Sequence, residues 1–132
     1  MFASAVDMVR DVIDTQFEGI SAAWLWQGFL EDLPVAHVRA KGGTQGFIDR
    51  HDRVEVSVYT VNPVEESQGG QLGALDIAEQ LYSKLLSGPH YTKAGVIDSV
   101  EGERTPTLEA YTSGVDVASF SIFVTHRQVP LT

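Results

Sequence analysis

The sequence predicts a single α+β domain over residues 1–132, in which two helices pack as one layer on a mixed or antiparallel sheet. Two segments, 3–18 and 71–87, carry apolar residues at spacings of three and four, which is the helical period. Shorter segments alternate apolar and polar residues, which is the period of a half-buried strand. The elements follow in the order α-β-β-α-β-β, and this order favours both helices lying on one face of the sheet.

Both predicted helices have recognisable ends. Ser4 is expected to cap the helix at 3–18, because a serine hydroxyl can accept a bond from a backbone N–H in the first turn. Gly19 follows this helix and Gly88 follows the helix at 71–87, and glycine commonly occupies the position just after a helix.

Four strands are predicted, at residues 35–41, 53–60, 93–100 and 115–127. In the second of these, Val54, Val56 and Val58 alternate with polar residues, so we expect the valines in the core and the other face toward water or a partner. The strand at 115–127 is apolar on both faces, which favours a central strand or one covered by a neighbouring subunit.

The connections fall into two kinds. Residues 42–53, 62–70 and 101–113 are polar and are predicted to be loops, either contact loops or ordinary solvent-exposed ones. Residues 20–34 concentrate aromatic side chains in a short span. They form either an irregular segment that closes the core or a set of aromatics buried between subunits.

The charge balance bears on the class of partner. The chain has 18 acidic and 9 basic residues, a net charge of −9. Proteins that grip nucleic acid neutralise phosphates with basic patches, so this composition disfavours tight binding and is compatible with DNA sliding past. Acidity also maintains solubility. The absence of cysteine excludes disulfides and thiolate chemistry.

No targeting segment is predicted. The N-terminus has acidic residues at helical spacing and lacks a basic leader, so we expect neither a signal nor a transit peptide. No apolar run reaches the roughly 18 residues that span a bilayer.

One segment, Asp49–Arg53, combines residue types that could form a catalytic site. His51 there could act as a general base with Asp49 or Asp52, but a charged turn is the simpler interpretation. The four histidines are not spaced as a metal-binding cluster, and the glycine-rich segment 42–46 lacks the lysine of a phosphate-binding loop. We therefore predict no catalytic residue, metal or cofactor.

The chain resembles the tail terminator (minor tail, tail completion) proteins of long-tailed double-stranded DNA phages, particularly those of actinobacterial phages. The resemblance covers roughly residues 5–128 and rests on the order, spacing and length of the elements. It is carried by the acidic helix DMVRDVIDTQF, the strand-turn-strand LPVAHVRAKGG…DRVEVSVYT, the helix AEQLYSKLL and the segment AGVIDSVEGERTPTLEAYTSGVDVASFSIFVTHR. The segment from Trp24 to Glu31 departs from the family pattern.

This resemblance implies a non-enzymatic structural subunit of the virion tail, assembled in the host cytoplasm. Such subunits form a homohexameric ring on the head-proximal end of the tail tube, end tube polymerisation and provide the surface that head–tail connector proteins join. DNA passes through the ring, and no membrane is involved. The residues expected at a subunit or tail-tube interface are Trp24, Trp26, Phe29, Arg50, Asp52, Arg53, Tyr59, Glu65, Glu66 and Arg104.

Two alternatives stay open from the sequence. The chain could be a head–tail connector or neck protein of related fold. It could instead be a small α+β enzyme or ligand-binding domain that uses His51 with Asp49 or Asp52.

Overall fold

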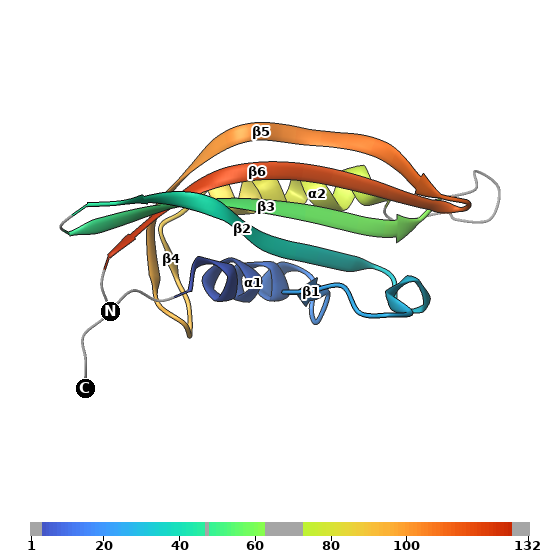
Figure 1. The fold of residues 1–132 in the computed structure, drawn as a ribbon, viewed down its shortest axis with the longest axis horizontal. Helices are drawn as coiled ribbons and strands as arrows, with labels where there is room; N and C mark the ends of the chain where they lie inside the picture. Colours follow the sequence, from blue (N-terminus) through green and yellow to red (C-terminus); the bar gives the residue numbers. More distant parts are fainter. Residues whose placement is uncertain (1–3, 47, 63–72, 128–132) are drawn as a thin grey trace.

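A computed structural model describes residues 4–46, 48–62 and 73–127 (Figure 1). The elements in chain order are α1 (Ala5–Gln16), β1 (Ser21–Ala22), the short 3₁₀ helix η1 (Phe29–Glu31), β2 (Val35–Gln45), β3 (Asp49–Val61), α2 (Ala74–Leu86), β4 (His90–Tyr91), β5 (Val96–Thr112) and β6 (Val115–Arg127).

All six strands belong to one sheet, in the order β1-β2-β3-β6-β5-β4. The sheet is mixed, because β1 runs parallel to β2 while the other neighbouring strands pair antiparallel. β6 lies between β3 and β5, so the expectation that residues 115–127 form a central strand is confirmed.

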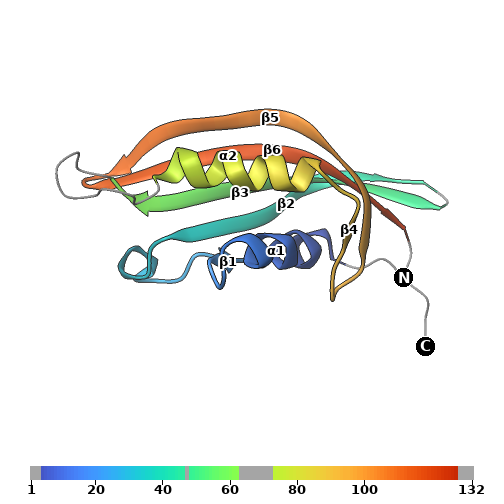
Figure 2. The ribbon, with the colours of Figure 1, turned by 180° about the vertical axis from the view of Figure 1, so that it is seen from behind.

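The predicted fold class is wrong. The described part of the chain is mostly β, with 51% of its residues in strands, and its sheet is a half-barrel rather than a flat layer covered by a layer of helices. The element order resembles the predicted one, but β2, β3 and β5 are longer than expected, whereas β6 has the predicted bounds. In Figures 1 and 2 the sheet arches from β5 down to β2 and β1, and α1 lies below this arch.

Two of the three predicted loops are strands. Residues 42–45 and 49–53 continue β2 and β3 as a hairpin, and residues 101–112 belong to β5. Side chains of these segments are largely exposed, so the sequence has no buried face and no alternation of apolar residues from which a strand could be predicted. The third predicted loop, 62–70, lies outside the described residues except for Asn62.

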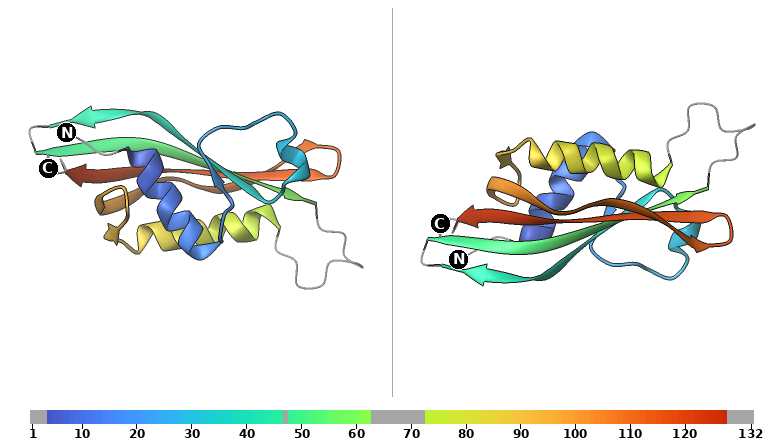
Figure 3. Two further views of the ribbon diagram at one scale, coloured as in Figure 1. Left: turned by 90° about the horizontal axis from the view of Figure 1, so that it is seen from below. Right: turned by 90° about the horizontal axis from the view of Figure 1, so that it is seen from above.

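One core joins both helices to the inner face of the sheet. Figure 2 shows α2 in front of β3 and β6, and Figure 3 shows α1 crossing the strands on the same side. Met8, Val9 and Ile13 of α1 and Leu81 and Leu85 of α2 are almost completely buried there. Val9 and Ile13 lie four residues apart, as do Leu81 and Leu85, which places them on one face of each helix, as predicted; Met8 shares this face of α1.

The sheet's contribution to this core comes from alternate positions of its two central strands. Val54, Val56 and Val58 of β3 are fully buried, and Val56 pairs with the buried Phe120 of β6. Because side chains alternate along a strand, the residues between these valines point away from the helices. The sheet therefore has an inner face toward α1 and α2 and an opposite face, here called the outer face.

The helix boundaries agree closely with the prediction. Ser4 caps α1 by accepting a bond from the backbone N–H of Asp7 at 3.3 Å. Gly19 has φ +75° shortly after the helix ends, a conformation that glycine adopts without strain. In the described part of the chain, neither helix is long and apolar enough to cross a membrane.

Candidate functional site

The outer face carries a group of charged residues that we call the charged cluster. It consists of Arg39, Lys41, Arg53, Glu55, Glu103 and Arg104. Lys41, Arg53, Glu55, Glu103, Arg104 and Ser121 line a groove of about 500 Å³. Four cations thus share two carboxylates, so this part of an acidic protein has a local excess of positive charge.

Glu55 is the centre of the charged cluster. Its carboxylate accepts a bond from Arg39 Nε at 2.9 Å, lies 3.4 Å from Arg104 Nη2 and lies 4.0 Å from Lys41 Nζ. Burial raises the pKa of Glu55, but the hydrogen bond from Arg39 and the nearby cations outweigh it and hold this pKa below its usual value. Glu55 is therefore held in its charged form, with cations from β2 and β5 fixed around it.

Glu103 organises the other side of the charged cluster. Its carboxylate accepts a bond from Ser121 Oγ at 2.7 Å and from Arg53 Nε at 2.7 Å. The Ser121 hydroxyl and the Arg53 guanidinium lower the pKa of Glu103. Arg53, whose side chain is about half exposed, is oriented by this contact.

A bulge in β5 allows both Glu103 and Arg104 to reach the outer face. The strand pairing shifts between Gly102 and Arg104, so β5 has an extra residue here relative to β6. A bulge places two consecutive residues opposite one partner residue and breaks the strict alternation of faces. The neighbouring Gly102 lies on the inner side, against the Tyr82 side chain of α2.

The outer face also carries five aromatic residues, which we call the aromatic cluster: Trp24, Trp26, Phe29, Tyr59 and Tyr111. The rings meet edge to face, with centroids 5.0 Å apart for Tyr59 and Tyr111 and 5.2 Å apart for Phe29 and Tyr59. This geometry is favourable for aromatic pairs. Burial raises the pKa of Tyr59, and Tyr111 adds to this effect.

Exposure increases from the base of the aromatic cluster to its edge. Tyr59 is 8% exposed, Tyr111 is 47% exposed and Trp24 is 67% exposed. Trp26 Nε1 donates to Asp32 Oδ2 at 3.3 Å, a hydrogen bond within the segment between β1 and β2. The segment is therefore anchored on the sheet by Phe29 and leaves one tryptophan largely in solvent.

The structure divides the ten residues predicted for an interface into three groups. Six lie in the two outer-face clusters: Trp24, Trp26, Phe29, Tyr59, Arg53 and Arg104. Arg50 and Asp52 lie on the inner face, and Glu65 and Glu66 lie outside the described residues. The ten predicted residues do not include five members of the two clusters: Arg39, Lys41, Glu55, Glu103 and Tyr111.

The sequence contains a periodic pattern around some of these residues but not around the others. Arg39 and Lys41 alternate with apolar residues in the predicted strand at 35–41 and share its polar face, but this face was not assigned to an interface. Glu103 and Tyr111 lie in residues 101–112 of β5, which were predicted to be a loop, so sequence periodicity could not place them.

The inner face holds a buried polar pair near the ends of β3 and β6. Asp52 and His126 are 4% and 0% exposed, and Asp52 Oδ2 lies 2.7 Å from His126 Nε2. Arg50 Nε donates to the other carboxylate oxygen at 3.1 Å. Asp52 thus joins residues from two strands within the protein and is not presented at a surface.

His51, the candidate general base, lies on the other side of the sheet from Asp52. It is exposed, and its Nδ1 lies 2.8 Å from Thr125 Oγ1. Consecutive strand residues point to opposite faces, so these two side chains do not come together. Asp49 Oδ1 lies 4.0 Å from Arg127 Nε.

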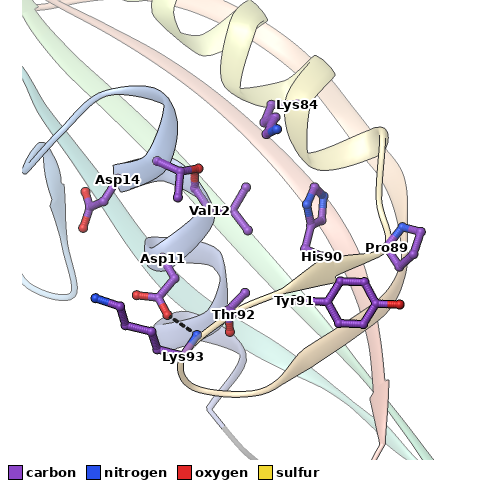
Figure 4. Close-up of a pocket in the computed structure, with 10 residues that line it drawn as sticks. Asp11, Val12, Asp14, Lys84, Pro89, His90, Tyr91, Thr92 and Lys93 are labelled. Atoms are coloured by element: carbon purple, nitrogen blue, oxygen red, sulfur yellow. Dashed lines mark hydrogen bonds between the residues drawn. The ribbon is translucent and has the colours of Figure 1, made fainter.

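A second groove, of about 560 Å³, separates α1 from β4 (Figure 4). Asp11, Asp14, Lys84 and Lys93 line it, and Asp11 accepts a bond from the backbone N–H of Lys93 at 2.9 Å. His90 lies in its wall, with Nε2 2.8 Å from the carbonyl oxygen of Leu85. Within the described ranges, no three histidine or carboxylate side chains are grouped so that they could hold a metal ion.

No protein-family model matches the chain, and no curated protein matches it significantly.

Proposed function

We propose that this protein is a structural assembly subunit of a phage tail, a tail terminator that forms a ring on the head-proximal end of the tail tube. In this role it ends tube polymerisation, provides a surface for head–tail connector proteins and lets DNA pass through the ring. The proposal begins from the resemblance of nearly the whole chain to such proteins.

The observation that supports it most directly is the outer face of the sheet. Both helices pack on the inner face, so the charged and aromatic clusters lie on the side that the described helices leave uncovered (Figure 3). Exposed aromatic and arginine side chains are enriched at the centres of protein interfaces. A subunit that contacts several neighbours requires such a surface.

The overall charge is also compatible with the proposal. A ring through which DNA passes must not bind phosphates tightly, and a chain with net charge −9 repels them. The salt bridges of the charged cluster leave its cations partly neutralised by Glu55 and Glu103.

The test uses a phage that encodes this chain. Deleting its gene should produce abnormally long tails without attached heads, and the purified protein should co-sediment with tail tubes and cap one end. Tails of normal length after deletion would contradict the terminator role. Tails of normal length that fail to join heads would instead identify a connector.

A further inference from the structure

We propose that the outer face binds a second copy of this chain, and that the charged cluster of one copy receives the acidic exposed side of α1 of the next. This inference specifies the contact within the proposed ring and rests on that proposed function. It can be tested on the purified protein without tail tubes, so the two proposals can fail separately.

Charge is distributed unevenly over the molecule. The charged cluster contains four of the nine basic residues and only two of the 18 acidic ones. The remaining five basic residues share the rest of the chain with 16 acidic residues. The charged cluster is therefore a basic surface on an otherwise acidic molecule, and its electrostatic complement is present on every other copy.

The acidic surface that would meet the charged cluster is the exposed side of α1. Asp7, Asp11 and Asp14 follow one another along α1 at spacings of four and three, so they lie on the same side of the helix. They line a groove with Arg10 and Lys93, whose charges offset part of theirs. The core-facing side of α1 is formed by different residues, so these carboxylates are accessible or half-buried.

The two surfaces lie on opposite sides of the sheet, because α1 packs on the inner face (Figures 2 and 3). A contact between two different surfaces is heterologous, and it leaves one surface of each kind free on every pair. Such a contact adds further copies until it closes as a ring or continues as a filament. An isologous dimer through the charged clusters would instead bring like charges together.

The arginines of the charged cluster are held in place before binding, and the aromatic cluster lies on the same face of the sheet. Arg39, Arg53 and Arg104 are held by Glu55 and Glu103, so less side-chain freedom is lost on binding. Trp24 and Tyr111 of the aromatic cluster are exposed by 67% and 47%. Aromatic area beside oriented charges is typical of interfaces between proteins.

Nucleic acid fits this surface less well than a second copy does. The cations already share two carboxylates, and the acidic remainder of the molecule repels a polyanion that extends beyond the charged cluster. A compact acidic helix can meet the charged cluster without approaching the rest of the surface.

The experiment measures the mass of the purified protein by analytical ultracentrifugation. The wild type should associate at low ionic strength and dissociate at about 1 M salt, where the Debye length is about 3 Å. The double variants Arg53→Glu/Arg104→Glu and Asp7→Lys/Asp11→Lys should each be monomeric, and their equimolar mixture should associate again. Arg127→Glu makes a single charge reversal at an exposed position at the end of β6, outside both proposed surfaces, and should associate as the wild type does.

Crosslinking tests the geometry independently of charge, since the chain has no cysteine. The two crosslinking variants are Thr107→Cys and Thr15→Cys. Thr107 lies beside the charged cluster on β5, and Thr15 lies on α1. A bis-maleimide should produce a ladder of crosslinked copies only when both cysteines are present in the same chain. Circular dichroism checks that every variant is folded.

Several results would overturn the inference. These are a monomeric wild type at low salt, full association of Arg53→Glu/Arg104→Glu, or crosslinked dimers from Thr107→Cys alone. A phage carrying Arg53→Glu/Arg104→Glu whose tails still have normal length and join heads would overturn the inference and leave the terminator role intact. Normal tails after deletion of the gene would remove the proposed function instead.

Discussion

The side chain of Tyr82 on α2 lies directly against the backbone of Gly102 on β5. A Cβ atom at Gly102 would overlap the Tyr82 hydroxyl oxygen. Tyr82 also meets Phe120 of β6 edge to face, with centroids 5.3 Å apart. The missing side chain at Gly102 therefore lets α2 approach the sheet next to the bulge that orients Glu103 and Arg104.

Replacing Gly102 with alanine should lower the free energy of unfolding by about 1–3 kcal/mol, because the added methyl group overpacks this contact. Urea denaturation measures the change. The double variant Gly102→Ala/Tyr82→Phe should lose less stability than the two single variants together, since removing the hydroxyl makes room for the methyl group. Full additivity would show that the two sites do not interact.

Replacing Asp52 with alanine should destabilise the protein by about 1.5–3 kcal/mol, the cost of removing a charged hydrogen-bond partner from a buried site. The variant loses the bonds from Arg50 and His126 at once. The control is His51→Ala, an exposed position that should change stability by about 0.5 kcal/mol or less. Equal losses for the two variants would argue against the assignment of the buried pair.

Replacing Glu55 with glutamine should make stability less dependent on pH. The folded-state pKa of Glu55 is lowered, so its charged form stabilises the fold above the unfolded-state value of about 4.3, and this contribution is lost as pH falls through the folded-state pKa. The stability difference between wild type and variant should be about 1 kcal/mol or less at pH 7 and should shrink below about pH 4.

Denaturation midpoints at several pH values measure this difference. Glu109→Gln, at an exposed position of β5, serves as the control and should show little effect at any pH. A gap between wild type and Glu55→Gln that widens at acidic pH would contradict the sign of the pKa shift.

Replacing Phe29 with alanine should release the Trp24–Phe29 segment from the sheet, because Phe29 contacts both Tyr59 and Tyr111. Each aromatic contact contributes about 0.5–1.5 kcal/mol beyond area burial, so the expected loss of stability is about 1–3 kcal/mol. Near-ultraviolet circular dichroism should also lose part of its tryptophan signal. Trp24→Ala, at a largely exposed ring, should leave stability nearly unchanged and reduce self-association.

The sequence by itself determined the elements that have one buried face. The apolar spacing in α1 and α2 and the valines of β3 were enough to place these elements, since burial imposes a period on the sequence. The cap at Ser4 followed from local chemistry in the same way. Trp24, Trp26 and Phe29 of the aromatic cluster were also singled out, because aromatic residues are concentrated in that short span, whereas Tyr111 was missed.

Only the tertiary structure decided the class of the fold and the composition of the outer face. Residues 101–112 of β5 are largely exposed, so no hydrophobic pattern marks them as a strand, and the sheet to which they belong is a half-barrel. Its bulge brings Glu103 and Arg104 to one face, which alternation alone would have separated. Arg39, Glu55 and Arg104 meet because three strands far apart in the sequence lie side by side, and no local pattern encodes that proximity.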